Sequence, residues 1–147
     1  MLRDGRQVAL NLVVEALLEA AHVHGQGADV LDAESDLARA LRALAERRRR
    51  AALELGDHVR RLGDLPSEPD ADLKAVKDVL AWVQGALADD QREQVLERSR
   101  QAEADLAESV RAALAEDLPP DTRAVVQDLL RVPELNALGP AAGDRTI

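Results

Sequence analysis

The sequence predicts an all-α protein in which several helices pack as a bundle. Its 147 residues are 46% apolar, and Ala (27), Leu (24) and Val (14) dominate this apolar part. Ala and Leu are strong helix formers, whereas Phe and Tyr, which favour strands, are absent and Ile occurs once. Apolar residues also recur in steps of three and four along most of the chain, which is the period of one helix face. Together these observations favour helices over sheets.

The first two helices are expected over residues 6–28 and 33–62. A break between them is indicated by two glycines and two aspartates, Gly25, Gly27, Asp29 and Asp32. We call the apolar line along each helix its seam, because bundles pack through such lines. The seam of the first helix contains Leu10, Val14, Leu17, Ala21, His24 and Ala28. The seam of the second contains Leu37, Leu41, Leu44, Arg48, Ala52, Leu55, Val59 and Leu62.

A shorter helix is expected over residues 70–88, after a break from Gly63 to Asp70 that includes two prolines. Its seam contains Leu73, Val76, Leu80, Val83 and Leu87. The single tryptophan, Trp82, belongs to this helix. We expect Trp82 either to anchor the helix on the bundle or to help a partner dock.

The last two helices are expected over residues 91–116 and 120–132. Asp90 and Glu93 have the spacing of a helix N-cap and of the acidic residue that accompanies it. The turn between the helices contains two prolines, which disfavour helix in the residue before each of them. The two seams contain Val95, Ser99, Ala102, Glu103, Leu106, Val110 and Ala113, and then Val125, Val126, Leu129 and Leu130. We expect Pro133 to end or kink the last helix, one domain over residues 1–138, and a flexible tail over 139–147.

The lengths of the connections suggest how the helices are joined. Short loops between helices 6–28 and 33–62, and between 91–116 and 120–132, predict two antiparallel hairpins. The long connection between the hairpins contains the helix over 70–88. This pattern fits a four-helix bundle with one long crossover, and it also fits a five-helix up-and-down array. The periodicity does not decide between them.

Several sequence features resemble a bacterial ferritin-like family of unknown function. They are the stretch AERRRRAALEL over residues 45–55, the VRRLG that follows at 59–63, Trp82, Glu103, and the turn Asp117-Leu118-Pro119-Pro120. The similarity covers residues 9–130. It implies a ferritin-like four-helix bundle whose extra helix lies in the crossover, with a di-iron site that is degenerate or absent. It implies a fold more than an activity, although a stress-related role would be consistent with the family.

The ferritin-like resemblance raises the question of an iron site. Such sites use a Glu from each of two helices and a Glu-x-x-His from each of the other two. Glu19-Ala20-Ala21-His22 is the one literal match, and Glu15 lies one turn before it. At 100° per residue these side chains point away from the seam of their helix, and the last helix has no His. An intact site is therefore not expected. The alternative is an iron-handling protein that uses Glu15, Glu19, His22 and Glu103.

Three polar residues nevertheless lie on seams that are otherwise apolar, namely His24, Arg48 and Glu103. Buried charges are costly unless they are paired. We therefore expect Arg48 and Glu103 to form an ion pair inside the bundle, with His24 close enough to hydrogen-bond. The side-chain cation would then occupy the place of a metal. The alternative is that Arg48 extends outward along its own stem and Glu103 lies at the rim.

The run Arg47, Arg48, Arg49 and Arg50 is the strongest concentration of positive charge. Consecutive residues fan around a helix, and Glu46 and Glu54 lie three or four positions away, so a solvated face is favoured over a ligand site. A weaker possibility is that a partner docks on this run and on Trp82. With 19 basic against 28 acidic residues, a net charge of −9 and 1% aromatic residues, nucleic-acid binding is not expected.

The remaining inventory excludes several function classes. Without Cys there is no disulfide, thiolate metal site or cysteine nucleophile, and no phosphate-binding glycine motif is present. The longest apolar stretch, residues 8–21, contains Asn11, Glu15 and Glu19, so we expect neither a membrane span nor a signal peptide but a cytoplasmic protein. The 17 arginines against two lysines are typical of a GC-rich bacterial genome. We therefore predict a non-catalytic bundle without a cofactor, acting in structure or protein interaction, including self-association.

Overall fold

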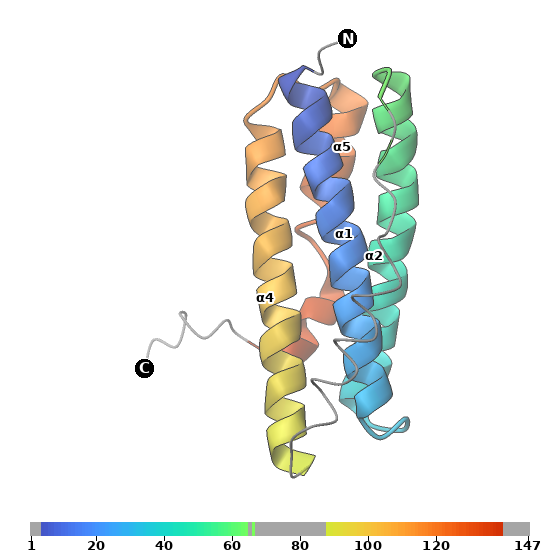
Figure 1. Ribbon diagram of the computed structural model, residues 1–147, viewed down its shortest axis with the longest axis vertical. Helices are drawn as coiled ribbons and strands as arrows, with labels where there is room; N and C mark the ends of the chain where they lie inside the picture. The colour runs from blue at the N-terminus through green and yellow to red at the C-terminus, as the bar shows by residue number, and fades with distance from the viewer. Residues whose placement is uncertain (1–3, 65, 67–87, 140–147) are drawn as a thin grey trace.

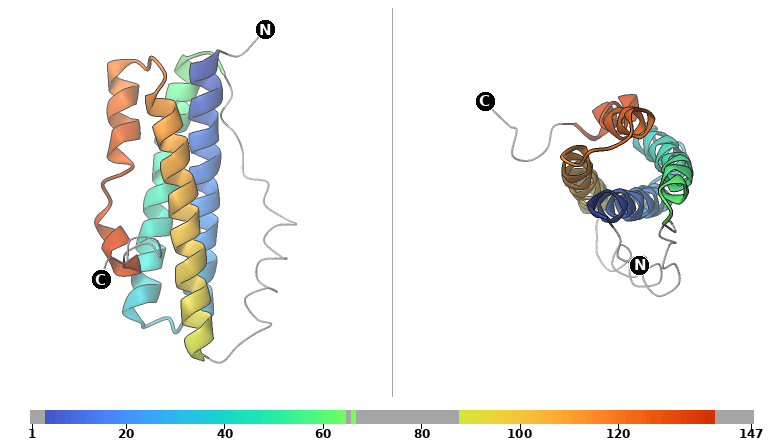
Figure 2. Two further views of the ribbon diagram at one scale, coloured as in Figure 1. Left: turned by 90° about the vertical axis from the view of Figure 1, so that its left-hand side faces the viewer. Right: turned by 90° about the horizontal axis from the view of Figure 1, so that it is seen from above.

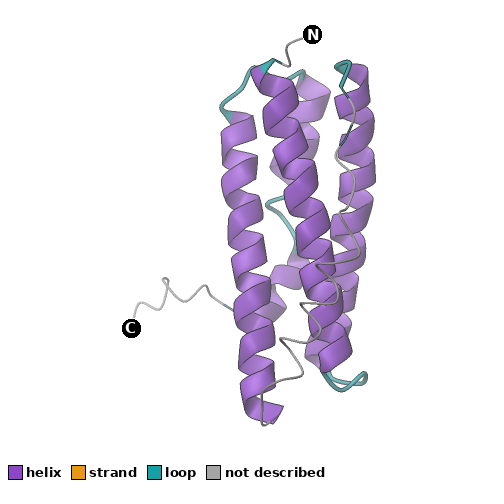
Figure 3. Ribbon diagram, viewed as in Figure 1, coloured by secondary structure: helices purple, strands orange, loops and turns teal. Residues whose placement is uncertain are grey.

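The computed structural model describes residues 4–64, 66 and 88–139, and every regular element in these ranges is helical. The elements are α1 (Gly5–Val30), α2 (Asp36–Arg61), α4 (Ala88–Leu114), α5 (Pro120–Asp128) and the 3₁₀-helix η1 (Pro133–Leu138) (Figure 1). Figure 3, coloured by secondary structure, contains no strand in the described part. The predicted all-α class is confirmed. The expected helix over 70–88 with Trp82, and all of the expected tail except Gly139, lie outside the described residues.

The four α-helices surround a common interior, and each lies antiparallel to its neighbours. Seen from above in Figure 2, α1 lies between α2 and α4, and α5 lies opposite α1. α2 ends beside the start of α1, where Gln7 donates a hydrogen bond to the carbonyl of Leu62 at 2.5 Å. α4 begins at the other end of the bundle. The connection between α2 and α4 therefore joins opposite ends of the bundle.

Local sequence signals account for the helix starts. Asp4 is the N-cap of α1 and forms a reciprocal capping box with Gln7, in which each side chain bonds to the other residue's backbone N–H. Ser35 caps α2 by accepting from the backbone N–H of Ala38 at 3.0 Å. α5 begins at Pro120, which is tolerated there because the first helical residue needs no N–H donor.

Two of the expected helix boundaries are wrong, the end of α1 and the start of α4. α1 continues through Gly25 and Gly27 to Val30, so these glycines do not interrupt it. Gly27 is instead a packing position, because a Cβ there would lie 2.8 Å from Cγ1 of Val95 on α4. Asp90 lies inside α4 rather than at its N-cap.

The largest correction concerns the last helix. α5 has nine residues and ends at Asp128, whereas α1, α2 and α4 have 26, 26 and 27 residues. Pro133 does not terminate this helix but opens η1. Leu130, assigned to the seam, is 44% exposed, because it follows the end of α5. The fourth edge of the bundle is therefore filled first by α5 and then by η1.

The apolar core forms two separate clusters along the bundle. The first joins α1, α2, α4 and α5 and contains Ala9, Leu10, Val13, Val14, Leu17, Ala52, Leu55, Val59, Leu106, Val110, Ala113, Leu118, Val126 and Leu129. The second joins the other ends of α1, α2 and α4 to η1 and contains Ala28, Leu37, Ala38, Leu41, Leu44, Val95, Leu96, Val132 and Leu138. The gap between the clusters falls between Leu17 and Ala28 on α1 and between Leu44 and Ala52 on α2.

One described helix, α1, is long and apolar enough to cross a membrane by length and composition, although the sequence led us to expect no such segment. Half of its most apolar 18-residue window is buried inside the bundle. Core helices of soluble proteins pass the same test, so this is weak evidence for a membrane span.

Candidate functional site

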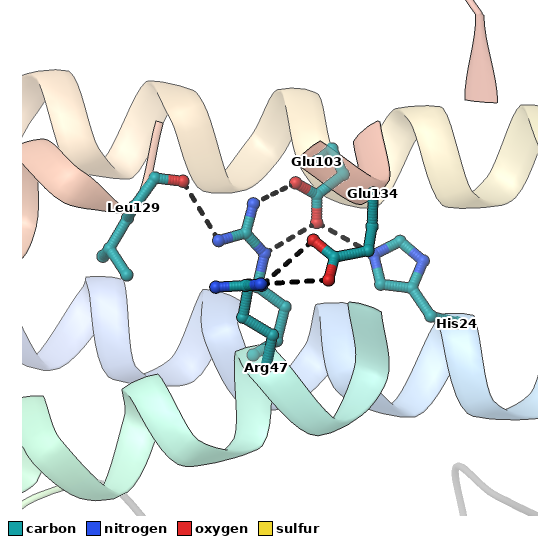
Figure 4. A network of polar contacts seen from close by, with 6 residues as sticks. His24, Arg47, Glu103, Leu129 and Glu134 are labelled. Atoms are coloured by element: carbon teal, nitrogen blue, oxygen red, sulfur yellow. Dashed lines mark hydrogen bonds and ion pairs between the residues drawn. The ribbon is translucent and has the colours of Figure 1, made fainter. Parts of the chain in front are cut away.

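Three polar side chains from three helices meet in the gap between the two apolar clusters (Figure 4). Arg48 of α2 donates from Nε to Oε2 of Glu103 on α4 at 3.1 Å, and from Nη2 to Oε1 of the same carboxylate. His24 Nε2 of α1 lies 2.8 Å from Oε2 of Glu103. We call these three residues the polar layer. The pairing expected from the sequence is the arrangement that the structure contains.

The polar layer is buried. The side chains of His24 and Arg48 are 0% and 2% exposed, and that of Glu103 is 11% exposed. Small residues surround it, since Ala20 and Ala21 on α1, Ala45 and Ala52 on α2 and Ala102 on α4 are all buried near these positions. These alanines leave room for three long or ring-shaped side chains inside a bundle of ordinary width.

The electrostatics favour an ionised Glu103. Burial alone raises its pKa, but hydrogen bonds from His24 and Arg48, together with the charge of Arg48, outweigh burial and lower the pKa below its ordinary value. An ionised carboxylate only accepts hydrogen bonds, so His24 Nε2 carries the proton and donates. Arg48 remains protonated at any ordinary pH. Glu103 is therefore a carboxylate that accepts three hydrogen bonds in a mostly dry interior.

Arg48 also explains where α5 ends. Its Nη1 donates to the carbonyl of Leu129 at 3.0 Å, and Leu129 is the C-cap of α5. The last carbonyls of a helix have no donor within the helix, and a cation there is favoured by the helix dipole. One guanidinium thus neutralises Glu103 and caps α5. The sequence placed Arg48 in the interior but gave no indication of this second contact.

The other arginines of the run point in different directions. Arg47 forms a two-point ion pair with Glu134 of η1, in which both N···O distances are 3.0 Å, and these bonds lower the pKa of Glu134. Arg49 and Arg50 contact Glu46 on their own helix at 2.9 and 3.4 Å. The run therefore forms no single basic stripe, and its first member fastens η1 to α2 (Figure 4).

The residues of the alternative iron site are not brought together. Glu15 is exposed on α1, more than two helical turns from His24, which is the α1 residue that Glu103 contacts. Glu19 and His22 are partly exposed on the same helix. In the ranges 4–64, 66 and 88–139, no group of three or more His, Asp or Glu side chains has an arrangement suited to a metal ion.

A second buried histidine, His58, is not among the candidate residues predicted from the sequence. His58 is 6% exposed, and its Nδ1 lies 2.7 Å from Oγ1 of Thr122, which is also buried. Asp121 approaches the same nitrogen at 3.9 Å. A catalytic relay needs its two partners on opposite ring nitrogens, so this cluster lacks the geometry of a triad. It ties the end of α2 to the start of α5.

A cleft of about 700 Å³ lies on the outer side of the polar layer, between α2 and the α5–η1 edge. The α2 side contributes Ala43, Glu46, Arg47, Arg48, Arg50, Ala51 and Glu54. The other side contributes Ala124, Val125, Asp128, Leu129, Arg131, Val132 and Glu134. Three members of the arginine run thus line one cleft. The lining has four positive and four negative side chains, which does not favour a simple anion or cation as its occupant.

Comparison of the chain with models of known protein families, with characterised proteins and with solved structures gave no significant match. The geometry of the described residues is therefore what bears on function.

Proposed function

We propose that this chain is a non-catalytic, ferritin-like helical bundle of the cytoplasm that serves as a structural or protein-interaction module. One observation carries the proposal. The interior carboxylate, Glu103, is saturated by two donors of Arg48 and one of His24. In di-iron bundles, inward carboxylates and imidazoles converge on metal ions. Here a guanidinium cation supplies the compensating positive charge.

The connectivity supports the ferritin-like part of the proposal. α2 ends and α4 begins at opposite ends of the bundle, as required when two antiparallel hairpins are joined by one long crossover. A four-helix bundle in which every connection is a short loop would not place these ends so far apart, whereas a five-helix up-and-down array would.

The cleft supports the interaction part. Its lining combines small and aliphatic side chains, such as Ala51 and Val125, with charged side chains of both signs. Protein interfaces also combine apolar and polar groups in one surface. We infer that the cleft receives another protein surface, with a second copy of this chain as the first candidate.

Metal content separates this proposal from its alternative, an iron-handling protein that uses Glu15, Glu19, His22 and Glu103. The protein is purified without a His tag, analysed for bound metals, and titrated aerobically with Fe(II). We expect no stoichiometric iron and no oxidation above the protein-free rate. Two irons bound per chain with ferroxidase turnover would overturn the proposal. Glu103→Gln identifies the site in that case, because it would abolish such binding.

Self-association is tested by sedimentation velocity at micromolar concentrations. We expect a dimer that dissociates when two cleft charges are reversed in Arg50→Glu/Arg131→Glu. The matched control, Arg39→Glu/Arg49→Glu, changes the same charge at exposed positions of α2 outside the cleft lining and is expected to remain dimeric. A wild-type monomer throughout, or dissociation of the control as well, would contradict association through this cleft.

A further inference from the structure

Two buried polar atoms close to the polar layer have no hydrogen-bond partner among the described residues. They are Nδ1 of His24 and Oγ of Ser99, and both residues are 0% exposed. Buried polar groups in native proteins are nearly always hydrogen-bonded, either to protein or to ordered water, because an unpaired one costs about 1–3 kcal/mol. These two atoms therefore call for a common explanation.

The contacts between α1 and α4 place Ser99 on the face of α4 that packs against α1, one turn from the polar layer. Ser99 lies one turn from Glu103, which contacts His24, and one turn in the other direction from Val95, which faces Gly27. His24 and Gly27 are themselves about one turn apart on α1. Ser99 is therefore bracketed by two inter-helix contacts, and its hydroxyl is buried between α1 and α4 next to the polar layer.

The two atoms have complementary hydrogen-bonding capacities, but they are not bonded to each other. In the neutral Nε2–H form of His24, Nδ1 is a lone-pair acceptor, and it is directed away from Glu103 (Figure 4). The Ser99 hydroxyl can donate and accept. A direct bond between them would give each atom a partner, which neither has. A molecule that donates to one and accepts from the other satisfies both.

We propose that a single buried water molecule is bound between α1 and α4, where it donates to His24 Nδ1 and accepts from Ser99 Oγ. Buried waters characteristically bind polar groups that are otherwise unpaired. The water extends the polar layer into a continuous chain of hydrogen bonds from Ser99, through His24, Glu103 and Arg48, to the carbonyl of Leu129.

A high-resolution crystal structure of the full chain tests the site directly. We expect one ordered water about 3 Å from both atoms. Ser99→Ala is expected to lose it, since the substitution removes one of its two partners. Ser109→Ala, on the same helix, is expected to retain it. A metal ion, a direct Ser99–His24 bond, or the lack of any ordered atom there would overturn the proposal.

Nitrogen NMR of the imidazole rings provides a second test in solution. We expect His24 in the Nε2–H form, with a Nδ1 resonance displaced by an accepted hydrogen bond. Ser99→Ala should move the Nδ1 resonance, whereas Ser109→Ala should leave it in place. A His24 resonance unchanged in Ser99→Ala would show that Ser99 does not share the bound molecule.

Discussion

Arg48 and Glu103 form a two-point contact across the interior of the bundle, and the same guanidinium reaches the last carbonyl of α5. The contact joins α2 to α4, which lie diagonally across the bundle, and it connects both to α5. One arginine therefore links three helices at the level where the apolar core is interrupted.

Removing Arg48 alone should be strongly destabilising. Arg48→Met leaves Glu103 buried with His24 as its one donor in the polar layer, and we expect the free energy of unfolding to fall by about 3–5 kcal/mol. Arg48→Met/Glu103→Met removes both charges and should recover at least half of that loss, because no unpaired charge remains. Urea denaturation followed by circular dichroism measures both. A double variant as unstable as Arg48→Met alone would contradict this coupling.

Acid should remove the contribution of Glu103. Its pKa is lowered in the folded state, so its stabilisation is complete above the unfolded pKa of about 4.3 and is lost as the pH falls through the folded pKa. The difference in stability between wild type and Glu103→Gln should therefore shrink as the pH falls below about 4. Denaturant titrations across this range measure it. Glu97→Gln, which removes an exposed carboxylate from the same helix, is the control, and a difference as large at pH 3 as at pH 5 would refute the assignment.

The two glycines near the end of α1 should respond oppositely to alanine. Nothing lies within 4 Å of a Cβ built at Gly25, so Gly25→Ala should stabilise the protein by about 0.5–1 kcal/mol through helix propensity. Gly27→Ala should destabilise it, because the new methyl meets Val95 Cγ1 at 2.8 Å. Thermal unfolding measures both changes. Val95→Ala should partly rescue Gly27→Ala, and the lack of any rescue would mean that the close approach of α1 and α4 is not the cause.

The ion pair between Arg47 and Glu134 should contribute modestly to the attachment of η1. Arg47→Glu places two carboxylates together and should lower stability by about 1 kcal/mol, whereas the exchanged pair Arg47→Glu/Glu134→Arg should restore most of it. Hydrogen exchange of the η1 amides measures the local effect. Arg39→Glu, which removes a surface pair confined to α2, should leave these amides unchanged. Uniformly faster exchange in both variants would argue against a specific role for Arg47.

The helical class, the seams and the interior pair could be predicted because each depends on periodicity. His24, Arg48 and Glu103 occupy seam positions, and side chains on a seam must meet inside a bundle. The buried state of His58 was not predicted, because it lies beside the seam and is covered only when Thr122 packs against it. Its burial depends on a residue 64 positions away.

The end of α5 was missed for a similar reason. Residues 129–132 have helical spacing, so local pattern extends the helix to Pro133. In the folded chain, Arg48 donates a hydrogen bond to the Leu129 carbonyl, and Arg47 forms an ion pair with Glu134. These contacts form only when α2 is packed against this segment. The role of Gly27 could not be predicted for the same reason, because its close approach to Val95 depends on how two helices pack and not on the sequence of either one.

The charged residues that interrupt the core also bear on how the helices align with one another. A bundle built almost wholly from Ala, Leu and Val has many near-equivalent alignments, because sliding one helix by a turn exchanges one aliphatic contact for another. Sliding α2 here would remove Arg48 from both Glu103 and Leu129 and leave a cation among leucines. Such misaligned states contain unpaired buried charges, which are strongly destabilising. The polar layer therefore favours one register of the helices over the registers that differ from it by a turn.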